Sequence, residues 1–166
     1  MFRNCETLIS LNLSNFNTSI ASDFYGMFYN CKSLSFINLT SFSFSNVKSI
    51  NFMFSGCESL NSIELSSNIK TPLLTSIDGM FSQCYSLTSI DLSLFNWDKI
   101  NSLENLFYDC QKLTSIDLSS FNKKNNIRTK NMFKGISSSG TIKIQRNTIL
   151  EEKIPTGWEI IYIDSE

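Results

Sequence analysis

The chain has 166 residues, of which 42% are hydrophobic and 17% are charged, and this composition is enough to build one hydrophobic core. Its formal net charge of −1 gives no field that would attract nucleic acid or an anionic membrane. It contains no histidine, the commonest general base, and no run of about 18 apolar residues that would span a bilayer.

A repeat of about 26 residues organises the chain from its first residue. Five cysteines, each preceded three residues earlier by Phe, recur at spacings of 26, 26, 27 and 26 residues. They are Cys5, Cys31, Cys57, Cys84 and Cys110, and the copies begin at Met1, Met27, Met53, Met80, Leu106 and Met132. A fixed period in this range is typical of a solenoid, in which each copy buries its apolar face against its neighbours. Function is then expected on the surface that the stack displays.

The first copy opens with the repeat motif itself at Met1. It has neither the basic start nor the apolar core of a signal peptide. It also lacks the polar outer face that normally caps the end of a solenoid. We therefore expect that the chain is a fragment, or that another chain or domain stacks on this end.

Each copy contains a strand pattern and a return segment. The last three residues of L-x-x-[IL]-x-L alternate in, out, in, as on a strand of period two. Apolar residues then follow at i, i+3, i+7 and i+10 in the segment Val47–Cys57, which predicts a helix or helical turn. The predicted class is α/β: a leucine-rich-repeat solenoid of about six 26-residue repeats over residues 1–146, with a short parallel sheet on one face and helical or irregular turns on the other.

The third copy departs from this pattern. It has one extra residue, and it places Asn68 where four other copies have Phe. The replaced aromatic residues are Phe16, Phe42, Phe95 and Phe121. We expect the coil to be locally irregular here.

Residues 147–166 are predicted to form a C-terminal cap. The segment Thr148–Glu151 has the spacing of a capping box, which predicts the start of a short helix. The segment Trp158–Ile163 is rich in strand-forming residues. We expect Trp158 to seal the last repeat, and the alternative is that it stacks on a ligand.

The evenly spaced cysteines are expected to be core residues. Zinc sites need short C-x-x-C pairs, which are absent. Cysteines on neighbouring strands would point in parallel about 4.8 Å apart, whereas a disulfide needs Cβ atoms about 3.8 Å apart. A buried thiol packs as a small hydrophobic group.

Catalysis is not expected. Without histidine, the usual partner of a Ser or Cys nucleophile is absent. The chain also has no phosphate-binding Gly-rich motif and no nucleophile elbow. We predict a protein that is not an enzyme and that needs no cofactor or metal.

Two columns of residues are predicted to point away from the core along the strands, because they flank the buried central Ile. The first is Ser10, Phe36, Ser62, Ser89, Ser115 and Thr141, and the second is Asn12, Asn38, Glu64, Asp91, Asp117 and Lys143. Phe36 is either an apolar contact anchor or one exposed apolar residue of no consequence. Three stacked carboxylates about 5 Å apart repel one another by around 1 kcal/mol. They form either a solubilising face or a site whose repulsion is relieved by a basic partner or a cation.

The consensus M-F-x-x-C-x-x-L-x-x-I-x-L-S-x-F, seen from Met80 to Phe95, resembles the 26-residue repeat of BspA-like leucine-rich-repeat surface proteins. The resemblance runs from Met1 to about Ile144. It implies an interaction module, because members of that family are cell-surface proteins involved in adhesion and in binding to host or matrix. It also implies a location at the cell surface or outside the cell, although no export signal or anchor is recognisable in the chain. No catalytic residues come with it.

The sequence thus predicts a non-catalytic module for protein binding or adhesion, whose partner is a protein or a host or matrix ligand with basic character. The predicted contact residues are Asn12, Phe36, Asn38, Glu64, Asp91 and Asp117. The alternative is a structural subunit of a larger assembly, which stacks on another chain through its uncapped first repeat. Neither nucleic acid nor insertion into a membrane is expected.

Overall fold

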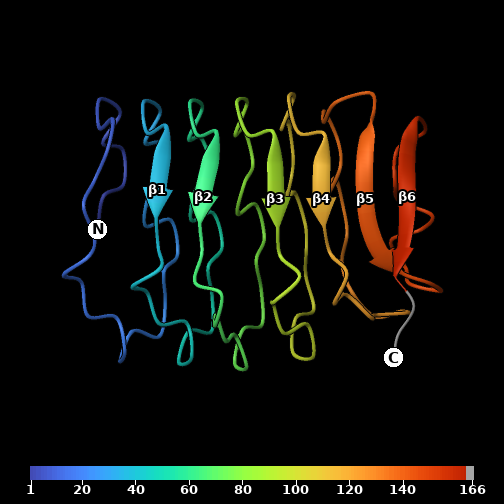
Figure 1. The fold of residues 1–166 in the computed structure, drawn as a ribbon, viewed down its shortest axis with the longest axis horizontal. Coiled ribbons are helices and arrows are strands. Elements are labelled where there is room, and N and C mark those ends of the chain that lie inside the picture. Colours follow the sequence, from blue (N-terminus) through green and yellow to red (C-terminus); the bar gives the residue numbers. More distant parts are fainter. Residues whose placement is uncertain (164–166) are drawn as a thin grey trace.

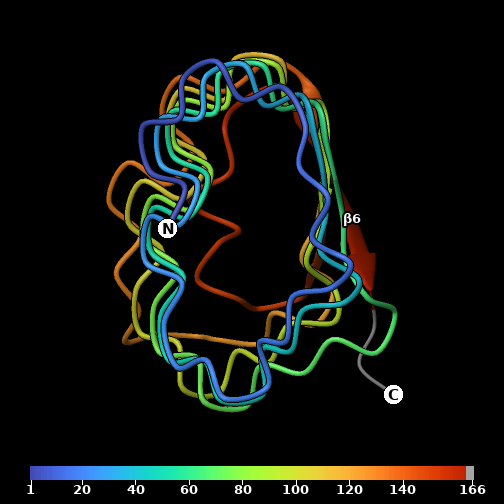
Figure 2. The same ribbon diagram turned by 90° about the vertical axis from the view of Figure 1, so that its left-hand side faces the viewer.

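The computed structural model describes residues 1–163, in which the chain winds through successive coils that stack side by side (Figure 1). Figure 2 shows the coils superimposed along the stacking direction, around a shared interior. One strand comes from each coil after the first, and one more follows at the C-terminal end. The strands are β1 (Phe36–Asn38), β2 (Ser62–Glu64), β3 (Ser89–Asp91), β4 (Ser115–Asp117), β5 (Gly140–Gln145) and β6 (Trp158–Ile163).

The strands pair in parallel and with the repeat in register. Ile37 lies opposite Ile63, and Ile116 lies opposite Ile142. Because equivalent residues face one another, each column of the sequence becomes a column of the sheet. The strand expected in the first copy is not formed, although Ser35 N–H still donates to the Ile9 carbonyl at 3.3 Å. The pairing forms two sheets, β1-β2 and β3-β4-β5-β6.

A second ladder runs along the return side of the coils. It consists of single parallel bridges that connect Asp23 to Ser49, Ser49 to Ser76, Ser76 to Ser102, and Ser102 to Arg128. Each coil is therefore held to its neighbours by backbone hydrogen bonds on two sides. The stack behaves as a β-rich solenoid.

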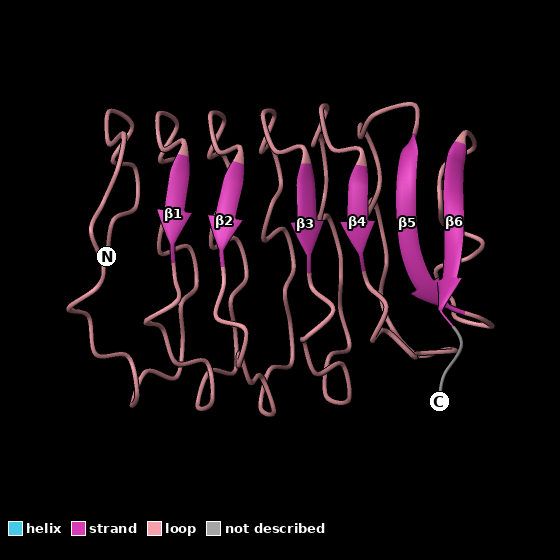
Figure 3. Cartoon of the chain, viewed as in Figure 1, coloured by secondary structure: helices cyan, strands magenta, loops and turns pink. Residues whose placement is uncertain are grey.

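The predicted helical segments are not observed, and this part of the α/β expectation was wrong. Residues 1–163 contain strands and turns only (Figure 3). Phe28 N–H donates to the carbonyl of Met53 in the next copy at 2.9 Å, whereas a helix would use a carbonyl four residues earlier. The three- and four-residue apolar spacing comes from successive β-turns. The described chain accordingly offers no helix of the length and apolarity needed to cross a bilayer.

These turns explain the Gly, Asn and Asp residues beside the Met-Phe and Cys positions. Asn30 has φ 55° and is the third residue of a turn in which Cys31 N–H donates to the Phe28 carbonyl at 3.1 Å. A positive φ at Asn30 but not at Tyr29 is typical of a type II turn, and this position favours Gly or Asn. Phe52 adopts the same conformation with φ 55°, and its ring occupies the space beside Gly79 that a Cβ would need.

Aromatic rings run through the interior as a continuous stack. One Phe per copy contributes, and neighbouring ring centroids lie 5.5 to 6.0 Å apart. The stack consists of Phe2, Phe28, Phe54, Phe81, Phe107 and Phe133. Stacked aromatic pairs contribute about 0.5–1.5 kcal/mol beyond the burial of their area. The stack therefore couples each copy energetically to the next.

Four of the cysteines line this core as reduced thiols. Each donates its S–H to the carbonyl of the stacked Phe one copy earlier, as Cys57 Sγ does to Phe28 O at 3.1 Å. Burial raises the pKa of Cys31, Cys57 and Cys84, and it raises the pKa of Cys110 to about 12. A thiol in this position gives a buried carbonyl a second hydrogen bond beside the one from the backbone, which an apolar residue could not do. Cys5 is the exception to the expected burial, because it is exposed in the outermost coil.

We expect one thiol of the native chain to react rapidly and four to be protected. Cys5 is exposed, whereas the other four are buried and stay protonated at neutral pH because their pKa is raised. A colorimetric thiol reagent, used with and without denaturant, should report one fast thiol in the native chain and five in the unfolded chain. Rapid native labelling of Cys57 or Cys84, located by mass spectrometry, would contradict the packing described here.

The C-terminal segment closes the stack with its longest strand pair, β5 and β6. Trp158 is buried, and its indole N–H donates to the Ser137 carbonyl at 2.9 Å, as expected for a sealing residue. The predicted helix at Thr148 is replaced by turns, although the Glu151 side chain does accept the Thr148 N–H at 3.3 Å. One half of the capping box thus forms without the helix. The expected cap extends to residue 166, and residues 164–166 lie outside the described part of the chain.

Candidate functional site

The predicted contact residues lie along one surface, which we call the open face: the outward-pointing side chains of β1 to β5 and of the equivalent segment of the first copy. Phe36 and Asn38 are on β1, Glu64 is on β2, Asp91 is on β3 and Asp117 is on β4. Asn12 occupies the same position in the first copy, where no strand forms. The alternation of the strands holds as predicted: Phe36 is 44% exposed, while its neighbour Ile37 is fully buried.

Four of these residues also have a structural role that the sequence analysis missed. The side-chain oxygen of Asn38 accepts the backbone N–H of Thr40 at 2.9 Å, and Asp91 accepts that of Ser93 at 2.8 Å. Asn12 and Asp117 make the same contact with Ser14 and Ser119. These Asx-turns bend the chain after β1, β3 and β4 and at the equivalent point of the first copy. The signal was present as the repeated [ND]-L-[ST] step, and Glu64, whose side chain is one carbon longer, does not make the turn.

Part of the repulsion expected among the stacked carboxylates is relieved within the chain itself. Asp117 forms an ion pair with Lys143 at 3.0 Å, because the parallel register places the next copy's residue opposite it. Burial acts to raise the pKa of Asp117, but hydrogen bonds from Ser119 and Lys143 outweigh burial and lower that pKa overall. Glu64 accepts a 2.5 Å hydrogen bond from the amide of Asn38.

The sheet is interrupted between β2 and β3, at the copy with the extra residue. In other copies the turn after the strand ends on Phe, and Phe42 N–H donates to the Leu39 carbonyl at 2.9 Å. In the third copy Ile69 N–H donates to Ser66 at 3.1 Å, so the turn is moved one residue along and Ile69 takes the buried place of the aromatic ring. The irregularity expected at Asn68 is thus present, and it opens the sheet.

A cleft of about 450 Å³ lies at this interruption. Leu65 is half-buried at its edge, whereas the equivalent Leu39 and Leu92 are fully buried. The lining consists of Ser62, Ile63, Glu64, Leu65, Ser66, Ser67, Ile69, Ser89, Ile90, Asp91, Leu94 and Phe95. Two predicted contact residues, Glu64 and Asp91, therefore share one cleft.

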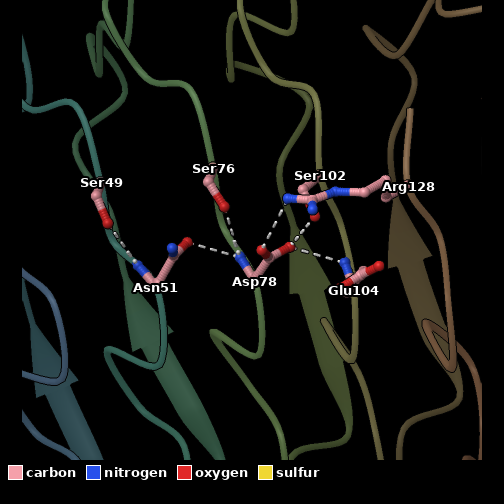
Figure 4. Close-up of polar contacts among 7 residues, drawn as sticks. All are labelled: Ser49, Asn51, Ser76, Asp78, Ser102, Glu104 and Arg128. Carbon is pink, nitrogen blue, oxygen red and sulfur yellow. Dashed lines mark hydrogen bonds and ion pairs between the residues drawn. The ribbon is translucent and has the colours of Figure 1, made fainter. Parts of the chain in front are cut away.

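A second polar constellation lies on the return side, around Asp78 (Figure 4). The Asp78 carboxylate accepts the Ser102 hydroxyl and, at 2.8 Å, the Glu104 N–H, and it lies 4.0 Å from the guanidinium of Arg128. The Asp78 N–H donates to the side chain of Asn51 at 2.8 Å. These residues were not predicted as a site, although a signal was present in the repeated Ser-[Ile/Leu]-[Asn/Asp/Glu] step at positions 49–51, 76–78 and 102–104.

The Asp78 constellation connects successive copies. Ser102 is fully buried, so its hydroxyl has no access to a substrate, and its neighbour Asp78 serves as the acceptor that satisfies it. Within residues 1–163 no group of three or more Cys, Asp or Glu side chains is placed to hold a metal ion. This network therefore joins neighbouring coils to one another.

The first coil leaves apolar side chains in solvent. Met1 is 86% exposed, Ile9 is 66% exposed and Ile20 is 91% exposed. Phe2, the outermost ring of the aromatic stack, is covered by Phe28 at 5.5 Å on its inner side and is only half-buried. The outer side of the first coil therefore exposes the kind of apolar surface that the following coils bury against a preceding coil.

Comparison with known proteins identifies a family. Residues 1–69 and 35–145 match the family described as Mycoplasma protein of unknown function, DUF285. The two matches overlap and together span nearly the whole array of repeats, as expected for a tandem repeat that can be aligned in more than one register. No curated protein matches the chain, and no solved structure matches it.

Proposed function

We propose that this chain, which belongs to the DUF285 repeat family, is a non-catalytic module that binds other proteins through its open face. The observation that carries the proposal is Phe36, a large aromatic side chain that is 44% exposed at the start of β1. Aromatic anchors of this kind dominate many protein interfaces. The rest of the two outward columns of the open face carries hydroxyl, amide or charged groups, as expected for the polar surround of such an anchor.

The rigidity of the open face supports the same proposal. Its side chains are presented by paired strands, and Asx-turns fix the chain at three strand ends and at the equivalent point of the first copy. A partner that contacts them does not have to order flexible loops, so less of its binding free energy is lost as conformational entropy. The return side of the described chain carries single bridges and turns instead of strands.

We further propose that the partner is a protein of the host or the extracellular matrix, and that binding takes place at the cell surface or outside the cell. The resemblance of the Met80–Phe95 consensus to BspA-like surface proteins supports this part of the proposal. Glu64 and Asp91 favour a partner with basic character. Binding should then weaken as salt rises, because the attraction between opposite charges is screened.

The test is binding of the immobilised chain to a panel of purified matrix proteins. We expect the variant Phe36→Ala/Glu64→Lys/Asp91→Lys to lose about 10-fold or more in affinity for a panel member that the parent binds, because the anchor is removed and the charges are reversed. The matched variant Tyr25→Ala/Asp98→Lys/Glu152→Lys makes the same changes at exposed residues outside the open face and should bind as the parent does. Equal affinity of all three proteins, with unchanged thermal melts, would exclude the open face.

A second function is favoured by the exposed apolar first coil, namely a structural subunit that stacks on another chain through this end. Met1, Ile9 and Ile20 would lose most of their exposure in such a stack. Sedimentation at increasing concentration separates the two functions. Self-association that Ile9→Glu/Ile20→Glu abolishes supports the structural subunit, whereas a concentration-independent monomer supports the binding module.

A further inference from the structure

We propose that the cleft between β2 and β3 is the receptor for a basic side chain, arginine or lysine, of the partner protein. The inference rests on the proposed function and specifies how the open face recognises its partner. It is carried by the combination of apolar walls, two carboxylates and an interrupted backbone ladder in one cleft of about 450 Å³.

The walls of the cleft suit the aliphatic stem of such a side chain. Leu65 is half-buried, Leu94 is 53% exposed, and the lining continues with Ile69 and Phe95. A long basic side chain buries its methylene groups against apolar surface while its charged end reaches polar groups. A purely polar or anionic ligand would leave these walls without a complement.

The charge in the cleft is negative, and no ion pair within the described chain neutralises it. Glu64 and Asp91 both line the cleft, and no described lysine or arginine forms an ion pair with either. Lys143, the basic residue of the same column, is paired with Asp117 at 3.0 Å, and its charge also attracts Asp91 from beyond ion-pair distance. A cation that enters the cleft would therefore meet two carboxylates without having to displace an internal partner.

One oxygen of each carboxylate is still able to accept a hydrogen bond. Glu64 uses Oε2 to accept the Asn38 amide, and Asp91 uses Oδ1 to accept the Ser93 N–H. Among residues 1–163 no donor reaches Glu64 Oε1 or Asp91 Oδ2. A guanidinium group carries five N–H donors in a planar fork, and an ammonium group carries three.

The interrupted ladder adds a backbone acceptor to the cleft. Leu39 N–H donates to the Glu64 carbonyl at 2.8 Å, and Leu92 N–H donates to the Asp117 carbonyl at 2.9 Å. The equivalent bond from Leu65 to the Asp91 carbonyl is not formed in the described chain. The Asp91 carbonyl, which lies beside the two carboxylates, therefore lacks the backbone N–H that the Glu64 and Asp117 carbonyls accept.

The test uses two short peptides and the full chain in solution. The probe is acetyl-Ala-Ala-Arg-Ala-Ala-amide, and its control replaces arginine by citrulline, which has the same shape but no charge. We expect the arginine peptide to shift the backbone amide NMR signals of Leu65, Ile69 and Asp91, and the citrulline peptide to leave them unchanged. The corresponding lysine peptide should produce shifts at the same residues.

Variants then assign the interaction to the two carboxylates. Glu64→Gln/Asp91→Asn should weaken binding of the arginine peptide about 10-fold, the loss expected for a charge-assisted contact that is partly exposed. The fold should survive, because an asparagine side chain at position 91 can make the same Asx-turn that Asn12 and Asn38 already make. The matched variant Asp98→Asn/Glu152→Gln removes two exposed carboxylates outside the open face and should bind as the parent does.

The outcomes separate this inference from the proposed function. Equal shifts with the citrulline peptide, or equal weakening by the two double variants, would overturn the basic-side-chain receptor. If the arginine peptide gives no shifts in the cleft while Phe36→Ala still lowers affinity for a matrix protein, the receptor is wrong and the binding module stands. NMR shifts of the cleft residues that Glu64→Gln/Asp91→Asn weakens support the basic-side-chain receptor, whichever matrix protein the chain binds.

Discussion

Replacing Ile116 with Asp is expected to unfold the chain. Ile116 is 1% exposed at the centre of β4, where it pairs with Ile90 on one side and with Ile142 on the other. The change removes about 2–3 kcal/mol of apolar burial and places a carboxylate where no partner can reach it, which costs several kcal/mol more. Copies stabilise one another only through their interfaces, so the loss should spread to neighbouring coils. Circular dichroism at increasing denaturant concentration measures the effect.

The neighbouring position provides the matched control. Ser115 is exposed on the same strand and points to the open face, so Ser115→Asp should change the free energy of unfolding by no more than about 1 kcal/mol. The two variants carry the same new side chain one residue apart. A parent-like melt for Ile116→Asp, or equal destabilisation by both, would show that the strand does not have the observed orientation.

Replacing Phe81 with Ala is expected to lower the free energy of unfolding by about 3–5 kcal/mol. Its ring is 1% exposed and is stacked between Phe54 at 6.0 Å and Phe107 at 5.9 Å. Truncation leaves a cavity in the middle of the stack and removes two aromatic contacts at once. The unfolding transition should also become broader or split, because the coils on either side lose the aromatic part of their coupling. Calorimetry and denaturant titration report both effects.

Phe36→Ala is the control for this prediction, because it makes the same truncation at an exposed site. Phe36 is 44% exposed and packs only in part against its neighbours, so we expect a loss under about 1 kcal/mol. This variant also serves as the binding test of the open face. If Phe81→Ala costs no more stability than Phe36→Ala, the aromatic stack does not carry the coupling between copies.

Much of the fold follows from the sequence because the chain repeats. A residue such as Ile90 recurs with Ile37 and Ile116 in the same local pattern, and alternation along a strand leaves one orientation that buries all three. The same alternation placed Phe36 and Asp91 on the outer surface, where the structure has them. Tandem repetition converts a local pattern into a long-range one, since equivalent residues must stack.

The return segments could not be assigned in the same way. Spacings of three and four residues arise from a helix and from successive β-turns alike, so the segment Val47–Cys57 fitted both. In the structure, the positive φ of Asn30 identifies a turn. In the sequence alone, an Asn or Gly inside an apolar pattern is equally compatible with the end of a helix. The choice was decided by hydrogen bonds such as that from Phe28 to Met53, which join different copies.

The sequence by itself determined the number and register of the copies, the inward and outward faces of the strands and the burial of the cysteine ladder beyond the first coil. Each of these depends on local alternation and on a fixed period. Only the tertiary structure decided that the extra residue of the third copy opens a cleft between β2 and β3, that Lys143 is already paired with Asp117, and that Asp78, Ser102 and Arg128 meet. These features depend on distances between coils, which backbone hydrogen bonds across copies set and which no pattern within one copy contains.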